Sequence, residues 1–460
     1  MASPTRDELA FLADQVRGPV FGRGQDGYAA ELAGFQTGFH PRPAVVVGAA
    51  DAEDVRAAVR FAAERGLAVA VRSTGHGVTV PVDGGVLIST KRLAEVTVHP
   101  EGRYARIGAG ARWSAVVALA EPHGLVPPSG SAGHVGVVGY TLAGGMGLLA
   151  REVGYAADHV RAVDVVTADG DLRHVTAATD PDLFWALRGG RDNFGVVTSL
   201  EIGLRPVERI YGGGIYFGSE HAEAVLAFFR DWTARAPETI TASVGMIGYP
   251  PLPVFPEPLR GRHVLHVRFA TTDIAEGPGL IQPWRAVAPT LIDAVGELAY
   301  RDAGSIYREP DFAHAYDGNS ALLSDLPPEV LDAIIGLAGA DAAVGCVVDL
   351  RHLGGALARE PAAPSAVSFR AANYILRVLS SPEGVGLAEV RATHQRLFDA
   401  VRPWTLGRSL NFVYGERAAA DFRSELYEKP TLDRLSALKA VHDPGNVFRA
   451  NHNIEPARRR

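Results

Sequence analysis

The segment Arg72-Ser73-Thr74-Gly75-His76-Gly77 holds side chains whose types and spacing could bind a ligand. It follows directly on residues 67–71, a continuous apolar run that predicts a buried strand. Small residues and glycines at the end of a strand bring backbone N–H groups together into a concavity that suits phosphate oxygens. The Arg72 guanidinium and the hydroxyls of Ser73 and Thr74 could add donors. On the residues alone, a histidine between glycines is more often a turn or packing residue than a functional one.

A second candidate segment is rich in glycine. It reads Ser129-Gly130-Ser131-Ala132-Gly133-His134-Val135-Gly136-Val137-Val138-Gly139-Tyr140 and continues through Gly144-Gly145-Met146-Gly147, with seven glycines between Gly130 and Gly147. That density would cost a regular helix or strand a large conformational entropy. Either the backbone here approaches a bulky ligand closely, or an unusual loop packs against another loop.

Neither segment is a Rossmann dinucleotide fingerprint. Gly108 and Gly110 supply the first two glycines of GxGxxG, but Trp113 stands where the third belongs, and residues 144–147 have the wrong spacing. Neither run follows a first strand with an acidic residue about 20 positions later. No metal site is expected either, because His263 and His266 would point to opposite faces of a strand.

The elements that must position these loops follow from periodicity. Residues 44–47 and 67–71 read as strands, and residues 51–65 as the helix between them, with Asp51 as N-cap and Gly66 ending it. This order predicts that the two strands pair in parallel, with a right-handed crossover.

The rest of the chain divides at about residue 206. The first part continues with predicted strands at 86–88, 96–99, 105–107 and 196–204, a helix at 114–123, and a hairpin of 160–167 with 172–175 around an Asp-Gly turn. The second part, to about residue 402, mixes predicted helices at 222–234 and 328–337 with strands at 264–269 and 367–376, which indicates a separate α+β domain. A last helix is predicted at 432–442.

Composition excludes several classes of function. The chain has 460 residues and a net charge of −7, which opposes nucleic-acid binding. Its single cysteine, Cys346, allows no intrachain disulfide and no CxxC zinc site. Charges near the start and the lack of a long apolar run argue against a signal peptide or a membrane span. A cytoplasmic protein, of bacterial origin by composition, is expected, and its oligomeric state stays open.

Five ordered motifs resemble the berberine bridge enzyme-like oxidases of the vanillyl-alcohol oxidase / p-cresol methylhydroxylase (PCMH) flavoprotein superfamily. They are the 72–77 turn, the 129–147 run, the GYAAD segment at 154–158, DLFWALRGG with NFGVVT at 182–198, and the closing DPGNVF and NHNI motifs at 443–454. The resemblance implies an α+β, two-domain, PCMH-type FAD-binding fold. Residues 1–205 would form the FAD domain, 206–402 the substrate or cap domain, and 403–460 a segment that returns to the FAD domain.

The resemblance also implies which residues hold FAD. His76 matches the histidine that bonds covalently to the isoalloxazine ring, while Ala132 stands where many members carry a second, cysteine link, so a single bond through His76 is expected. The backbone of 72–77 and 130–136 would cradle the pyrophosphate. The complete set of expected FAD contacts is Arg72, Ser73, Thr74, Gly75, His76, Gly77, Gly130, Ser131, Ala132, His134, Val135, Gly136, Gly139, Tyr140, Gly145, Asp158, Val196, Asn411 and Asn451.

The catalytic base is the weak point of the resemblance. Many relatives use a Tyr-x-Asn-Tyr motif, but residues 409–412 read Ser-Leu-Asn-Phe, without either tyrosine. Tyr374 is the first candidate and Tyr414 the second, with Tyr140 shaping the flavin face; each could equally be a buried structural tyrosine. A tyrosine base needs a cation to lower its pKa from about 10. Arg370 is expected to share a strand face with Tyr374.

The expected activity is an FAD-dependent two-electron oxidation of a small alcohol, amine or ring C–H, with O2 as acceptor and H2O2 as product. A sugar, a nicotine-like amine and a polyketide intermediate all remain possible substrates. Two alternatives stay open: a dehydrogenase of the same fold that uses another electron acceptor, and a flavin- or ligand-binding protein without turnover.

Overall fold

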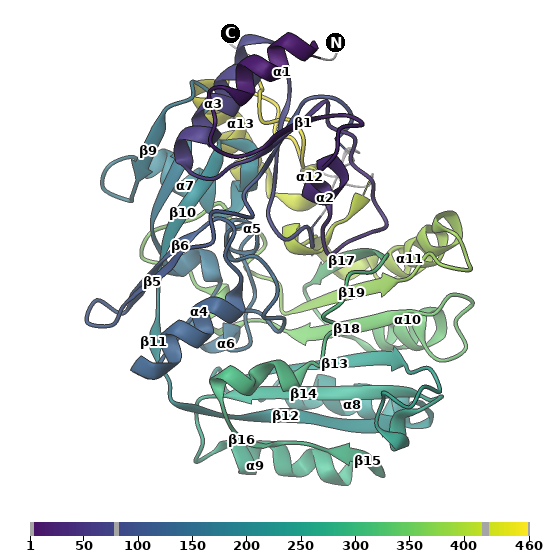
Figure 1. Ribbon diagram of the computed structural model, residues 1–460. Coiled ribbons are helices and arrows are strands. Elements are labelled where there is room, and N and C mark those ends of the chain that lie inside the picture. Colours follow the sequence, from purple (N-terminus) through teal and green to yellow (C-terminus); the bar gives the residue numbers. More distant parts are fainter. Residues whose placement is uncertain (1–3, 78–81, 416–422, 459–460) are drawn as a thin grey trace.

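The computed structural model describes residues 4–77, 82–415 and 423–458, and it has two parts (Figure 1). One part carries both ends of the chain and two small sheets, and the other is built on one large sheet. Helices and strands are both abundant, which confirms the predicted α+β class. Within the described ranges, no helix has the length and apolar character needed to cross a membrane.

The first small sheet forms around the predicted strand–helix–strand unit. Its strands, in spatial order, are β1 (Val20–Gly22), β2 (Val45–Gly48), β4 (Val86–Ser89) and β3 (Val69–Arg72). Asp51 caps helix α3 (Ala52–Glu64) as predicted, since its carboxylate accepts a hydrogen bond from the Asp54 N–H at 3.0 Å. β2 and β3 are parallel, but each pairs with β4, which lies between them. The 73–77 loop therefore leaves the sheet from its edge strand, β3.

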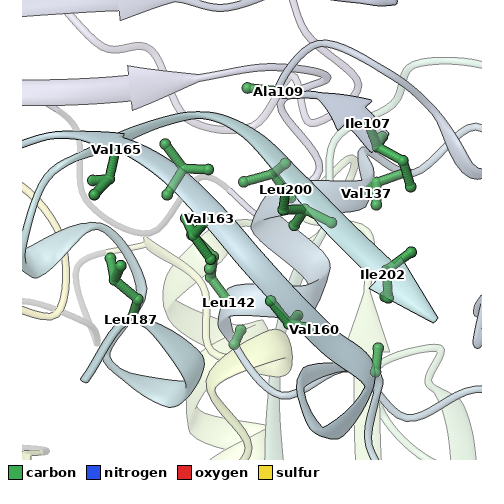
Figure 2. Packing of buried hydrophobic residues seen from close by; sticks show 14 of the residues in the cluster. Ile107, Ala109, Val137, Leu142, Val160, Val163, Val165, Leu187, Leu200 and Ile202 are labelled. Atoms are coloured by element: carbon green, nitrogen blue, oxygen red, sulfur yellow. The ribbon is translucent and has the colours of Figure 1, made fainter. Parts of the chain in front are cut away.

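The second small sheet is antiparallel and contains the predicted hairpin. Its order is β5 (Val96–His99), β6 (Tyr104–Gly108), β10 (Val196–Gly203), β8 (Val160–Val166) and β9 (Leu172–Val175). Val163 and Leu200 from this sheet belong to a buried cluster that includes Leu142 at the end of α5 (Val137–Leu142) and Leu187 in α7 (Pro181–Gly190) (Figure 2). This core fixes α5, and with it the glycine-rich loops at both of its ends.

The large sheet forms the second part. Its strands run in the order β15 (Thr290–Asp293), β12 (Arg209–Gly218), β14 (His263–Thr271), β13 (Ile240–Gly248), β18 (Val347–His352), β19 (Tyr374–Ser380), β17 (Asp317–Leu323) and β20 (Thr405–Gly407), with β16 (Gly296–Ala299) also on β12. Helices α8 (Ala222–Thr233), α10 (Pro328–Ala338) and α11 (Leu387–Ala400) pack on one face through a large apolar cluster. The opposite face of the central strands is turned toward the first part.

The predicted strand at 367–376 begins seven residues too early. The strand observed is β19, and the residues before it form a loop in which Phe369 has a φ of 58° and the Arg370 guanidinium pairs with Asp158. Within β19, Tyr374, Leu376 and Val378 face the helices, so the intervening Arg377 faces the other way.

The chain returns to the first part after β20. Because β20 still pairs with β17, the return follows residue 407 rather than 402. Helix α13 (Lys429–His442) then anchors the closing segment through Lys439, which is fully buried. Its ammonium donates to the carbonyls of Asn193 (2.6 Å) and Phe448 (2.9 Å) and pairs with Asp443 at 2.7 Å.

Arg151 connects the two parts. It lies in the short helix α6 (Ala150–Val153) beside the glycine-rich run, and its side chain is buried against the large sheet. Its guanidinium donates to the carbonyl of Ile240 at 2.9 Å, to the carbonyl of Leu353, and to His352 Nε2 at 2.9 Å. His352 itself lies outside the lining of the main cavity.

Candidate functional site

A cavity of about 600 Å³ lies between the glycine-rich loops and the open face of the large sheet. Most of the residues predicted to contact a cofactor line it, although they come from distant parts of the chain. They are Arg72, Ser73, Thr74, Gly75, His76, Gly77, Gly130, Ser131, Ala132, His134, Val135, Gly136, Gly139, Tyr140, Asn411 and Asn451. We call the side formed by 72–77, 130–147 and α5 the loop wall, and the side formed by β13, β14, β18 and β19 the sheet wall.

His76 lies in a cluster of stacked rings on the loop wall. Its ring is 4.0 Å from that of Phe35 and 4.8 Å from that of His134, between centroids. The Nδ1 atom is 2.8 Å from the Thr74 hydroxyl, and the buried Nε2 has no hydrogen-bond partner among the described residues. Burial, with a smaller effect of His134, Arg112 and His314, lowers the pKa of His76 to about 3. The imidazole is therefore neutral at physiological pH and can act as a nucleophile through nitrogen.

The turn that carries His76 requires glycine and is held from both sides. Gly75 has a φ of 74°, and a Cβ there would lie 2.8 Å from Arg72 Nε. The N–H groups of Phe35 and Gln36 donate to the carbonyls of Thr74 and Gly75, each at 3.0 Å. The N–H of Gly136 donates to the Thr74 hydroxyl at 3.3 Å, which joins this turn to the glycine-rich run.

The loop wall fits a large polar ligand. Arg72 Nε, Ser73 Oγ and the Tyr140 hydroxyl are buried without partners among the described residues. Each such group costs about 1–3 kcal/mol if it stays unsatisfied. At Gly139 an added Cβ would meet no protein atom within 4 Å, and the residue lines the cavity. These features fit the polar body of FAD and provide the room that its bulk needs.

Asn411 and Asn451 brace the loops from the closing segment. Asn411 accepts a hydrogen bond from the Gly145 N–H at 3.2 Å and donates to the Tyr140 carbonyl at 3.1 Å. Asn451 donates to the Asp192 carboxylate at 3.2 Å. Gly145 is thus a support for the loop wall and does not itself line the cavity.

Two further predicted cofactor contacts, Asp158 and Val196, do not line the cavity. Asp158 lies away from the cavity lining, and its carboxylate pairs with Arg370 at 2.6 Å. Val196 points into the core between the two small sheets, whereas its neighbours Gly195 and Val197 line the cavity. Adjacent strand residues point to opposite faces, so an error of one position changes the side.

The first-choice base also lies outside the cavity lining. Tyr374 lies in the core between the large sheet and its helices, where its hydroxyl is 2.7 Å from that of Thr233. Arg370 precedes the strand and is bound to Asp158, so it does not accompany Tyr374. Neither residue lines the cavity.

Tyr414 and Tyr140, the other two predicted tyrosines, line the cavity. Burial raises the pKa of Tyr414 to about 12, although the charge of Arg377 acts in the opposite direction. Tyr414 packs edge-on against Tyr316, whose hydroxyl donates to the His76 carbonyl at 2.8 Å. Burial also raises the pKa of Tyr140 well above its usual range.

The sheet wall holds a charged cluster that the sequence analysis missed. Arg268 on β14, Asp349 and Arg351 on β18, and Arg377 on β19 all line the cavity. The Asp349 carboxylate lies 2.8 Å from Arg268 and 2.6 Å from Arg351. Charged residues at central positions of apolar strands, as in HVRFA, VDLRH and ILRVL, were the available signal.

Comparisons with known proteins identify related sequences and structures. A model for an FAD binding domain matches residues 43–176, and a model described as berberine and berberine-like matches residues 410–455. The chain is 27% identical to (R)-6-hydroxynicotine oxidase of Paenarthrobacter nicotinovorans over 464 residues, covering 96% of this chain and 97% of that protein.

Two solved structures illustrate the likeness in fold. Xylooligosaccharide oxidase from Myceliophthora thermophila, in complex with xylobiose, aligns with a TM-score of 0.86 at 23% identity, over 98% of this chain and 99% of that one. Glucooligosaccharide oxidase from Acremonium strictum, described with a 6-S-cysteinyl, 8α-N1-histidyl FAD, aligns with a TM-score of 0.84 at 21% identity, over 98% of this chain and 100% of that one. These confirm the predicted two-domain PCMH-type fold.

Proposed function

We propose that this chain, which belongs to the berberine bridge enzyme-like FAD-linked oxidoreductases, oxidises a small organic molecule by two electrons and uses O2 as the acceptor, giving H2O2. The observation that carries the proposal is His76, a neutral imidazole with an unpartnered buried nitrogen at a cavity that fits FAD. A relative of matching length is named as an oxidase, which supports oxygen as acceptor.

We further propose that FAD is attached covalently through His76 alone. Ala132, which lines the same cavity, has no atom that could form the second bond named for glucooligosaccharide oxidase. The one cysteine, Cys346, is buried on the helix side of the large sheet, where its thiol donates to the Val344 carbonyl. The 72–77 turn and the backbone of residues 130–136 would hold the pyrophosphate, while Asn411 and Asn451 would lie near the ring.

FAD supplies the hydride acceptor when it is bound. The residues of the chain then have two tasks, which are to orient the substrate and to move its O–H or N–H proton. Tyr414 is our candidate for the residue that accepts the substrate proton. It is the second tyrosine predicted from the sequence, it lines the cavity, and the positive charge of Arg377 acts to lower its pKa. A neighbouring cation favours the phenolate and so opposes the burial that keeps the phenol protonated.

The covalent link is tested by acid precipitation of the purified protein. We expect the wild-type pellet to stay yellow, and the His76→Ala variant to release its flavin into the supernatant. His314→Ala is the matched control, since His314 also lies in the ring cluster and lines the cavity, and its pellet should stay yellow. A colourless wild-type pellet, or a yellow His76→Ala pellet, would contradict the assignment.

The acceptor is tested separately. Peroxide formation in air at a rate that matches substrate loss supports an oxidase, whereas reduction of a dye without peroxide indicates a dehydrogenase. Anaerobic mixing with a substrate library shows turnover through bleaching of the flavin band. A flavin-loaded protein that no compound bleaches would favour a binding protein.

A further inference from the structure

The sheet wall carries more positive than negative charge. Four arginines line the cavity there or at its rim: Arg268, Arg308, Arg351 and Arg377. Two carboxylates, Asp349 and Glu309, oppose them. His266, which accepts a hydrogen bond from Arg268, adds no positive charge, because burial lowers its pKa well below the usual range. Asp192 also lines the cavity, where its carboxylate accepts a hydrogen bond from Asn451.

The buried aspartate of the sheet wall, Asp349, has both carboxylate oxygens occupied by neighbouring arginines. Asp349 is 1% exposed, and its two oxygens are occupied by Arg268 at 2.8 Å and Arg351 at 2.6 Å. Arg268 also donates to His266 Nδ1 at 3.1 Å, and the Tyr307 ring lies against the guanidinium groups of both Arg268 and Arg351. These two arginines are therefore held rigidly by protein groups.

Arg377 differs from these two arginines. Its guanidinium lies near carboxylates, but it donates no hydrogen bond to a described residue. Its nearest carboxylate oxygens, on Asp349 and Glu309, are 3.5 and 3.9 Å away, beyond good hydrogen-bond geometry. Glu309 is engaged instead by the Ser131 hydroxyl at 2.7 Å. None of the five N–H donors of Arg377 makes a hydrogen bond to a described residue, and its Nε is buried. The guanidinium lies over the Phe412 ring, 4.9 Å from the centroid, with its side chain 13% exposed.

An arginine in this state needs a partner. Its buried Nε has no hydrogen-bond partner among the described residues, and such a donor costs about 1–3 kcal/mol if it stays unsatisfied. Its planar fork matches a carboxylate, which can accept two parallel N–H bonds. A neutral sugar or amine would leave the excess positive charge of the sheet wall unbalanced, and a cationic amine would increase it.

We propose that the substrate of this enzyme carries a carboxylate, and that Arg377 binds it on the sheet wall opposite the loop wall. Arg351 and Arg268, held by Asp349, add to the positive potential without giving up their own hydrogen bonds. This inference rests on the proposed oxidase function, since it assigns the substrate class of that cavity. Among the substrate classes that the sequence left open, this inference favours organic acids over neutral sugars.

The experiment uses the flavin-loaded protein with two probes of the same shape, benzoate and benzamide. Binding is followed by perturbation of the flavin spectrum and, independently, by titration calorimetry, which needs no flavin signal. We expect the Kd of benzoate to be at least about tenfold below that of benzamide. In Arg377→Met the two values should fall within about twofold of each other, and Arg377→Lys should retain an intermediate preference.

Arg285→Met is the control, because Arg285 pairs with Asp293 on the outer surface of the same domain and does not line the cavity. It should keep the wild-type preference. Equal binding of the two probes to the wild type would overturn the proposal, and so would a benzoate preference that survives Arg377→Met. If Arg377→Met shifts the flavin reduction potential but not the probe preference, the cation serves the cofactor and the proposal fails.

These outcomes are distinct from failure of the proposed function. A protein that carries flavin and oxidises only neutral compounds would refute the carboxylate assignment and leave the oxidase standing. A protein without flavin would refute the oxidase, and calorimetry would still measure the probe preference.

Discussion

The two walls of the cavity are built in different ways. The loop wall is made of glycines, backbone N–H groups and hydroxyls from two continuous segments. Several of its buried polar atoms have no hydrogen-bond partner among the described residues. The sheet wall is made of side chains from separate strands, and three of its arginines gather around the one carboxylate of Asp349. The first wall depends on a local sequence pattern, whereas the second depends on strand register between residues more than 100 positions apart, such as Arg268 and Arg377. The loop wall suits a shared cofactor, and the sheet wall is free to define the substrate.

The largest expected effect on stability is at the centre of the sheet wall. Although burial alone would raise the pKa of Asp349, the guanidinium groups of Arg351, Arg377 and Arg268 hold it well below the usual range, so the carboxylate is charged. Asp349→Asn should lower the free energy of unfolding by about 3–5 kcal/mol, because it leaves buried cations unpaired. Urea unfolding measures this loss.

Glu238→Gln provides the comparison for Asp349. Glu238 pairs with Arg359 at 2.6 Å, but the two side chains are 56% and 58% exposed. The free energy of unfolding should change by less than about 1 kcal/mol. Similar losses for both variants would mean that the cluster around Asp349 behaves as an ordinary surface network.

The next largest effect is on the rate of flavin reduction. It distinguishes Tyr414, which lines the cavity, from Tyr374, which lies between the large sheet and its helices. Tyr414→Phe should slow anaerobic flavin reduction about 100-fold, the lower range for removal of a proton-transfer group. Tyr374→Phe should leave the rate within about twofold and cost about 1 kcal/mol of stability, from the lost bond to Thr233. Stopped-flow absorbance with any substrate that bleaches the wild type makes the measurement. An equal loss of rate in both variants would argue against Tyr414.

A third prediction concerns pH at the junction of the two parts. Burial, with a smaller effect of Arg151, lowers the pKa of His352 to about 3. The unfolded chain takes up this proton near pH 6.5, so the stabilisation is complete above pH 6.5 and is lost as pH falls toward 3. From pH 7 to pH 5 the loss should be about 2 kcal/mol for this group.

His352→Gln keeps an acceptor for Arg151 and removes the titration. Urea unfolding of this variant should show a pH dependence smaller by about 2 kcal/mol over the same interval. An unchanged pH dependence would show that His352 is protonated in the folded protein, in conflict with its contact to Arg151.

The smallest effect distinguishes two helical glycines that both have open space around a Cβ. Gly336 is exposed in α10, so Gly336→Ala should stabilise the protein by up to about 1 kcal/mol and leave flavin content unchanged. Gly139 in α5 faces the cavity, so Gly139→Ala should lower the ratio of flavin to polypeptide without destabilising the apoprotein. Absorbance at the flavin band against protein concentration tests this. Full flavin content in Gly139→Ala would mean that the space beside it is not used by the cofactor.

The sequence predicted what is encoded locally. The turn at His76 and the 130–140 run could be located because glycine density and a preceding apolar strand occur in one continuous segment. The resemblance supplied the fold, and most of the FAD contacts that it implied do line the cavity. Asp158 could not be placed correctly, since its partner Arg370 is 212 positions away.

The sheet wall could not be read in the same way. Both faces of β19 are largely buried, so alternation alone does not show which face meets a ligand. A strand predicted seven residues too early then favoured Tyr374 and Arg370 over Arg377. A charged residue inside an apolar strand was the better guide, because a buried charge without a ligand or partner is costly.

Arg151 has a consequence for how molecules enter and leave. Its guanidinium also donates to the carbonyls of Ala236 and Pro237, so one side chain holds five acceptors on the far side of the junction. If the two parts separated by a hinge motion, the Arg151 guanidinium would lose all five hydrogen-bond acceptors at once. We therefore expect substrates and products to enter and leave the cavity without separation of the two parts.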